Sequence, residues 1–171
     1  MKAGDIMQIR EAMANDAGKI LNYCKIIGDE TNNLTFGKEG VSFTIEQEKE
    51  YLDRCFHSIN NIYIVAEDND EIIGACNLTS SSKERLKHNA EIGISVRKDH
   101  WGKGIASIML KKAIYFARGN GIKNISLNVR SDNERAKTLY KKFGFKKIGT
   151  IYKYLKIDGE YFDCDIMQLF L

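Results

Sequence analysis

Two apolar, strand-like runs, EIGISV at residues 91–96 and NISLNV at 124–129, lie on either side of a stretch with helical periodicity. In that stretch the apolar residues recur at helical spacing, at Ile105, Ile108, Met109, Ala113, Phe116 and Ala117. The order predicts a strand, a helix over about 105–118 and a second strand, which is the crossover connection of α/β folds. The chain is therefore expected to be of the mixed α/β class.

Turn and cap signals predict the remaining elements. Thr44 followed by Gln47 fits a capping box, which starts a helix over about 45–59. The other expected elements are strands at 6–10, 61–67, 71–80 and 89–96, hairpin loops at 68–70 and 157–159, helices at 15–27 and 133–143, and a long polar loop at 28–43. The chain has no proline and shows neither repeats nor a linker, so one domain spanning residues 1–171 is expected.

Composition excludes several classes of protein. The chain of 171 residues is 43% hydrophobic and 29% charged, which is the balance of a water-soluble domain. No stretch approaches the roughly 20 apolar residues that cross a bilayer, and the amino terminus MKAGDIMQIREAM lacks the apolar core of a signal peptide. We therefore expect a cytoplasmic location and no membrane partner.

The scattered cysteines and histidines show no ligand spacing, so buried free thiols and no metal site are expected. A net charge of +3 without a basic run does not favour a nucleic-acid partner. The segment KKFGFKKI at 141–148 matches about half of an RNA-recognition signature, which lies on a strand in that fold. Here Lys141 and Phe143 continue a helical period that Gly144 ends, so RNA binding is the weaker interpretation.

The segment WGKGIAS at 101–107 joins the first crossover strand to its helix. Gly102 and Gly104 can adopt positive φ, which turns successive backbone N–H groups toward one point. A helix N-terminus adds unpaired N–H groups and a partial positive charge, and Lys103 adds charge at the rim. Two interpretations remain, a tight turn that needs glycine and a pyrophosphate site. The dinucleotide fingerprint fails at Ser107 and the P-loop spacing is missing, so NAD and ATP are not favoured.

The segments VRKDHWGKGIASIMLKKAI and SLNVRSDNERAKTLYKKFGFKKIG closely resemble the GNAT superfamily of acyl-CoA-dependent N-acyltransferases. The family's phosphate loop, Q/R-x-x-G-x-G/A, aligns with residues 101–106, where Trp101 replaces the usual Gln or Arg. The second segment matches the family at Asn133, Ala136, Tyr140, Gly144 and Phe145. The detailed resemblance covers about residues 62–150.

The resemblance implies a strongly twisted mixed sheet with about four flanking helices. Two parallel strands, at 91–96 and 124–129, are expected to splay apart and admit the pantetheine arm of acetyl-CoA, which is the implied cosubstrate. The implied cofactor-binding residues are Ile94, Ser95, Val96, Gly102, Lys103, Gly104, Ile105, Ala106, Ser107 and Asn133. The family is often dimeric, so a homodimer is compatible with the resemblance, although the sequence does not decide the oligomeric state.

The implied reaction is direct attack of an amine on the thioester in a ternary complex. An alkylamine is almost wholly protonated at neutral pH, so a base must take a proton from it. Glu91, which opens the first crossover strand, is the candidate base, beside the alternative of an ordinary exposed strand residue. Tyr140 matches the family's tyrosine and is the candidate donor to the leaving thiolate. Because a phenol (pKa about 10) is a weaker acid than a thiol (about 8.5), we expect it to act mainly through a hydrogen bond.

The acceptor amine is the part that the sequence constrains least. The loop at 28–42, with Glu30 as the candidate substrate-binding residue, could attract a cationic amine, as could Asp163 and Asp165, although charged loops are usually just solvated. We expect acetyl transfer to the primary amine of a small molecule or polyamine. The alternatives are acetylation of a protein or peptide amino terminus, and a sensor domain that binds acyl-CoA without turnover.

Overall fold

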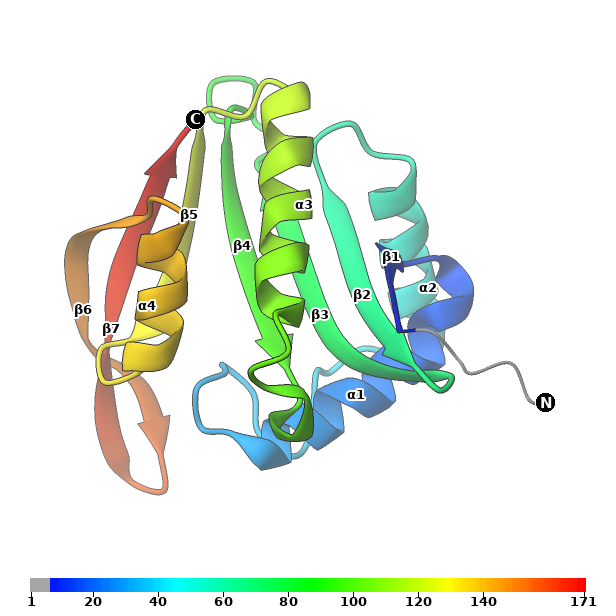
Figure 1. The fold of residues 1–171 in the computed structure, drawn as a ribbon, viewed down its shortest axis with the longest axis horizontal. Coiled ribbons are helices and arrows are strands. Elements are labelled where there is room, and N and C mark those ends of the chain that lie inside the picture. Colours follow the sequence, from blue (N-terminus) through cyan, green and yellow to red (C-terminus); the bar gives the residue numbers. More distant parts are fainter. Residues whose placement is uncertain (1–6) are drawn as a thin grey trace.

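A computed structural model describes residues 7–171 and consists of a seven-stranded sheet with helices on both faces (Figure 1). The strands are β1 (Gln8–Glu11), β2 (Ile62–Asp68), β3 (Glu71–Ser80), β4 (Asn89–Val96), β5 (Asn124–Arg130), β6 (Lys146–Ile157) and β7 (Glu160–Phe170). The helices are α1 (Ala17–Glu30), α2 (Ile45–Phe56), α3 (Ile105–Gly119) and α4 (Glu134–Lys142), with short 3-10 turns at Ala14–Asp16 and Lys98–His100. The strand order is β1-β2-β3-β4-β5-β7-β6, and β4 with β5 is the parallel pair of this sheet.

Local signals in the sequence are confirmed at the crossover, the hairpins and the helix cap. The helix α3 connects β4 to β5, its neighbour in the sheet. Both hairpin turns contain consecutive residues with positive φ, as tight two-residue turns require, at Asn69, Asp70, Asp158 and Gly159. The hydroxyl of Thr44 accepts a hydrogen bond from the Gln47 backbone N–H at 3.2 Å, which completes the predicted capping box.

Some predicted boundaries are wrong. The helix α1 continues through Glu30, so Gly28 is helical and the following loop begins at Thr31. The reason is tertiary: a Cβ on Gly28 would lie 1.9 Å from the carbonyl oxygen of Gly37, so the bare helix surface lets this loop fold back onto α1. The helix α2 ends at Phe56 rather than near Ile59. The predicted start of the first strand, at position 6, lies outside the described residues.

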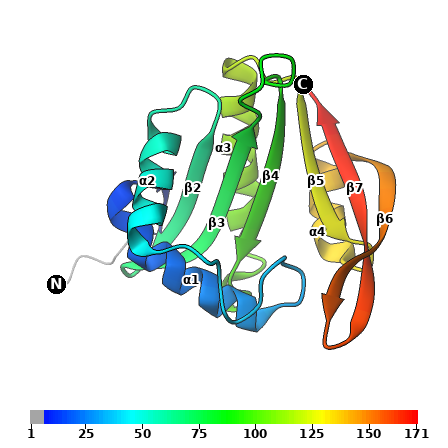
Figure 2. The ribbon, with the colours of Figure 1, turned by 180° about the vertical axis from the view of Figure 1, so that it is seen from behind.

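Each face of the sheet carries its own hydrophobic core. The helices α3 and α4 cover one face, while α1 and α2 cross the other (Figures 1 and 2). Successive strand residues point to opposite faces, so Ile64 of β2 packs in the core that includes α3, whereas Val65 packs in the core of α1 and α2. Burial on both sides explains why β2 and β3 are almost continuously apolar.

The parallel pair separates along its length. The strands β4 and β5 are hydrogen-bonded only where Asn89–Glu91 face Asn124–Ser126. From Ile92 onward β4 keeps its pairing with β3 on one side and has no pairing with β5 on the other. The strand β5 instead pairs with β7 along its whole length. The splayed strands that the resemblance implied are therefore present, and they open toward the end of the sheet where α1 crosses (Figure 1).

Candidate functional site

A cleft of about 900 Å³ passes through the splayed part of the sheet and reaches both faces. One half, which we call the glycine arm, is lined by the end of β4, the 102–107 segment and the first turns of α4. The other half, the aromatic arm, is lined by Tyr23, Phe36, Phe43, Glu48, Tyr51 and Tyr63. The cofactor-binding residues predicted from the sequence line the glycine arm, except for Lys103, which is exposed on the loop. Tyr140 lines this arm as well.

The loop before α3 has the backbone conformation that its glycines predict. Gly102 and Gly104 have φ of 78° and 79°, and a Cβ on either would meet no protein atom within 4 Å. The Ile108 N–H donates to the Gly104 carbonyl oxygen at 3.1 Å, so the N–H groups of residues 105–107 precede the first bond of the helix. These donors and the positive end of the helix have the chemistry that suits an anion, and residues 105–107 line the cleft.

Two aromatic and cationic contacts hold the rim of the glycine arm. The indole N–H of Trp101 donates to the Val96 carbonyl oxygen at 2.6 Å, which ties the loop to the end of β4. The Arg135 guanidinium lies 3.5 Å from the centre of the Trp101 ring and brings a positive charge to the cleft wall. Sequence reasoning missed Arg135, whose position two residues after Asn133 gave no sign that α4 faces the loop.

Asn133 and Tyr140 are positioned by α4. The Asn133 side-chain oxygen caps the helix by accepting from the Ala136 N–H at 3.2 Å, which leaves its amide N–H₂ group free to donate. Tyr140 is 7% exposed and its ring packs against Phe145 at a centroid distance of 5.7 Å. Burial, with a smaller effect of Cys76, raises the pKa of Tyr140. Its protonated hydroxyl, which has no hydrogen-bond partner within residues 7–171, can donate to a group in the cleft.

The structure does not bring Glu30 and Glu91 to the cleft lining. Glu91 is exposed and lies in the paired section of β4, before the strands separate. The Glu30 carboxylate accepts from the Lys98 backbone N–H at 2.8 Å and lies 3.5 Å from the Arg97 guanidinium, so it fastens the end of α1 to the end of β4. Glu30 was expected in a loop but is the last residue of α1, and this position brings its carboxylate to Arg97 and Lys98.

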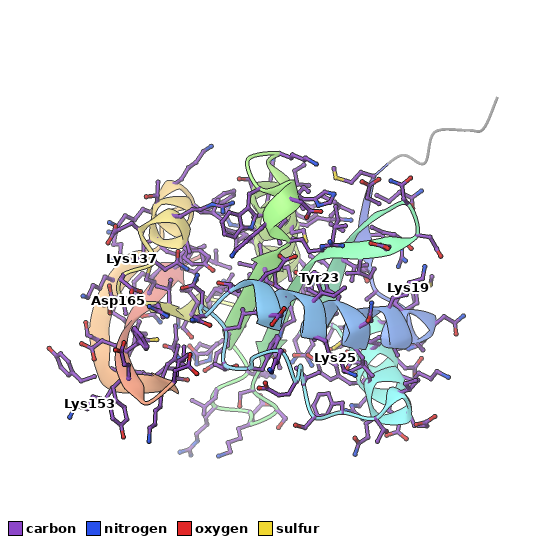
Figure 3. The ribbon with its side chains drawn as sticks, turned by 90° about the horizontal axis from the view of Figure 1, so that it is seen from below. Lys19, Tyr23, Lys25, Lys137, Lys153 and Asp165 are labelled. Carbon is purple, nitrogen blue, oxygen red and sulfur yellow. The ribbon has the colours of Figure 1, made fainter. Side chains whose placement is uncertain are left out.

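Asp165, another acidic residue considered for a cationic amine, is 2% exposed and internally paired. Its carboxylate lies 2.8 Å from the Lys147 ammonium and 3.5 Å from that of Lys137, a neighbour seen in Figure 3. Burial opposes its ionisation, but hydrogen bonds from Lys147, Ser131 and Thr150 outweigh burial and lower the pKa of Asp165. This residue joins α4 to the β6–β7 hairpin instead of facing the cleft.

The aromatic arm lies between α1, α2 and the back of the sheet. The 31–44 loop contributes several apolar side chains to its wall, at Leu34, Phe36, Val41 and Phe43. The hydroxyl of Tyr23, on the side of α1 that faces the strands in Figure 3, lies 2.9 Å from the Ser95 hydroxyl and joins the two arms. The Tyr51 and Tyr63 rings meet edge to face at 6.1 Å. The loop therefore lines the cleft with these apolar side chains and with Thr31, Asn33 and Thr35.

Neither a metal site nor a membrane helix is found within residues 7–171. No group of three or more His, Cys, Asp and Glu residues in that range could hold a metal ion, and Cys24, Cys55, Cys76 and Cys164 are buried free thiols, as predicted. The helices of the same part of the chain are too short or too polar to cross a membrane.

A mixed sheet that splays beside a glycine loop, with a tyrosine on the next helix, defines the acyltransferase class that the sequence resembles. Residues 29–145 match the family model "Acetyltransferase (GNAT) family", and the chain belongs to that family. An acetyltransferase of the GNAT family from Streptococcus pneumoniae has the same fold, with 28% identity, a TM-score of 0.93 and coverage of 97% of this chain and 99% of that one.

Curated relatives carry several acetyltransferase names. The uncharacterized N-acetyltransferase p20 of Bacillus licheniformis is 31% identical over 111 residues, which cover 64% of this chain and 61% of p20. The L-amino acid N-acetyltransferase AaaT of Escherichia coli is 31% identical over 105 residues, covering 61% and 65% respectively. The match thus spans about three fifths of the length of these relatives. The yncA protein of Salmonella typhimurium, described with its cofactor acetyl-CoA, shares the fold at 21% identity and a TM-score of 0.83.

Proposed function

We propose that the protein is an acetyl-CoA-dependent N-acetyltransferase that acts on the primary amine of a small molecule or polyamine. The observation that carries the proposal is the splay of β4 from β5 beside the glycine loop. The unpaired edge of β4 over residues 92–96 offers backbone groups to the amides of a pantetheine arm. The N–H groups at the start of α3, with Arg135 in the cleft wall and Lys103 exposed on the same loop, suit a pyrophosphate.

The amine attacks the thioester carbonyl directly in a ternary complex. A new C–N bond forms as the C–S bond breaks, the electron pair of that bond leaves with the sulfur, and the amine loses a proton. The Tyr140 hydroxyl donates a hydrogen bond to the departing thiolate, and its raised pKa keeps the phenol protonated for that purpose.

Glu91 remains our candidate for the proton acceptor. It shares a strand face with Gly93 and Ser95, because alternate residues of a strand point to the same side, and both of these residues line the cleft. Since Glu91 itself lies outside the lining, the proton must reach it through water. The aromatic arm, on the same face of the sheet, is the proposed site of the acceptor.

Calorimetry of acetyl-CoA binding, followed by an acetyl-transfer assay on a panel of amines, tests this function. We expect micromolar binding and turnover with small primary amines. Tyr140→Phe should bind acetyl-CoA as tightly as the wild type and lose most of the turnover. Absence of acetyl-CoA binding would refute the proposal, binding without turnover on any amine would favour the sensor, and acetylation of a peptide amino terminus alone would favour the protein substrate.

Two further expectations stay proposals. One is a cytoplasmic location, which fractionation of the producing cells tests, and the other is a homodimer, which light scattering of the purified protein tests.

A further inference from the structure

The cleft contains a buried carboxylate that has no hydrogen-bond or salt-bridge partner among residues 7–171. Glu48 of α2 is 3% exposed and lines the aromatic arm. No hydrogen-bond donor or cation of residues 7–171 contacts its carboxyl oxygens, whereas the buried Asp165 is matched by Lys147. Its helix neighbours Glu46 and Glu50 are exposed. Buried acids in proteins are normally paired, because an unpaired buried charge loses its hydration and gains no compensating interaction.

The groups around Glu48 are neutral. Cys24 of α1, Cys55 of α2 and Tyr63 of β2 lie close enough for the Glu48 charge to influence their ionisation. Burial, aided by that charge, raises the pKa of the Cys24 thiol to about 11, and burial also raises the pKa of the Tyr63 phenol. The Cys24 thiol and the Tyr63 phenol therefore stay uncharged at neutral pH, so neither group neutralises the negative charge of Glu48. Within residues 7–171 no positive charge pairs with this carboxylate, and a cationic ligand in the cleft would supply one.

We propose that Glu48 binds an ammonium group of the acceptor inside the aromatic arm. This inference rests on the proposed acetyltransferase function and specifies its substrate class. The walls suit a cation with an apolar body, because Phe36, Phe43, Tyr51 and Tyr63 line the same arm and aromatic faces attract cations. The carboxylate of Glu48, a side chain that is 3% exposed, adds the opposite charge.

The sheet order indicates that this ammonium is not the amine that is acetylated. Glu48 influences Tyr63 on β2, whereas the thioester enters beside β4, and β3 lies between these strands. Neighbouring strands are about 4.8 Å apart, so β2 lies roughly 10 Å from β4. The acceptor therefore carries two positive groups, one for the thioester and one for Glu48, joined by an apolar spacer of about that length. A linear aliphatic diamine has this form.

The test compares 1,8-diaminooctane with n-octylamine, which has the same carbon chain and one ammonium fewer. For the wild type we expect a KM for the diamine at least about tenfold below that for the monoamine, as one well-placed charge pair provides. Glu48→Gln should remove this difference by raising the diamine KM to that of the monoamine. Glu50→Gln, an exposed change on the same helix, should keep the difference.

Equal KM values for the two amines in the wild type, or an equal loss for both amines in Glu48→Gln, would overturn the inference. A second measurement separates it from the proposed function. Calorimetry of 1,8-diaminooctane on protein saturated with CoA reports the ammonium site without turnover. Diamine binding that disappears in Glu48→Gln would support the site even if no acetyl transfer occurred, and transfer to monoamines without diamine binding would leave the function and refute the site.

Discussion

Replacing Gly104 by alanine separates the ligand role of the loop from its backbone role. Gly104 has φ of 79° and lines the cleft, and a Cβ there would meet no protein atom within 4 Å. The substitution therefore costs folding only the left-handed backbone penalty of an L-residue, about 1–2 kcal/mol. In a chain of this length that corresponds to a loss of roughly 2–8 °C in Tm. The new methyl group would occupy space that the phosphates need, so acetyl-CoA affinity should fall at least about tenfold, or ~1.4 kcal/mol.

Gly121 provides the matched control. It has φ of 75°, an added Cβ would again meet nothing within 4 Å, and it lies beyond the far end of α3, outside the cleft lining. Gly121→Ala should lower the Tm by the same amount and leave acetyl-CoA binding intact. Calorimetry of acetyl-CoA and a thermal melt on both variants give the two quantities. The argument would be refuted if both variants bound acetyl-CoA equally, or if only Gly104→Ala lost stability.

Three further predictions follow from close contacts and buried acids. Gly28→Ala would place a Cβ 1.9 Å from the Gly37 oxygen, so we expect a loss of about 1–3 kcal/mol of stability and a raised KM for the amine, with the calorimetric Kd of acetyl-CoA unchanged. Because the pKa of Asp165 is lowered on folding, its contribution to stability is present above its ordinary pKa of 3.8 and is lost as pH falls. Asp165→Asn should thus lower the Tm at pH 7 and have a shrinking effect below pH 3.8; a pH-independent difference would contradict this. Burial raises the pKa of Glu48 above its ordinary 4.5, so ionisation of its carboxyl group lowers the stability of the fold as pH rises. Glu48→Gln should therefore raise the Tm at neutral pH but not below pH 4.5, and thermal melts at both pH values measure this difference.

Local patterns in the sequence predicted much of the fold and the glycine arm. The crossover helix, the capping box at Thr44 and both hairpin turns depend on residues close together in the chain, so their short-range signals were sufficient. The positive φ of Gly102 and Gly104 followed from the same kind of signal. The roles of the individual cofactor-binding residues came from the resemblance and stay proposals.

The extent of α1 and the place of Glu30 could not be obtained in this way. The polar stretch after residue 27 favoured a loop, but Gly28 packs against Gly37 and the helix continues. That contact joins residues nine positions apart and is visible only in the folded chain. It places Glu30 at the helix end, where its carboxylate accepts a hydrogen bond from the Lys98 backbone N–H, outside the cleft lining.

By itself the sequence determined which elements form and which glycines turn the chain, because these depend on propensities and turn chemistry over a few residues. In the structure Glu48 lies at helical spacing from Leu52 and Cys55, and these three are the buried residues of α2. Only the tertiary structure decided that this face borders a cavity, that β4 leaves β5 after Glu91, and that no cation of residues 7–171 pairs with Glu48. Cavities and charge pairing depend on the distances between elements far apart in the chain, and a one-dimensional pattern does not contain those distances.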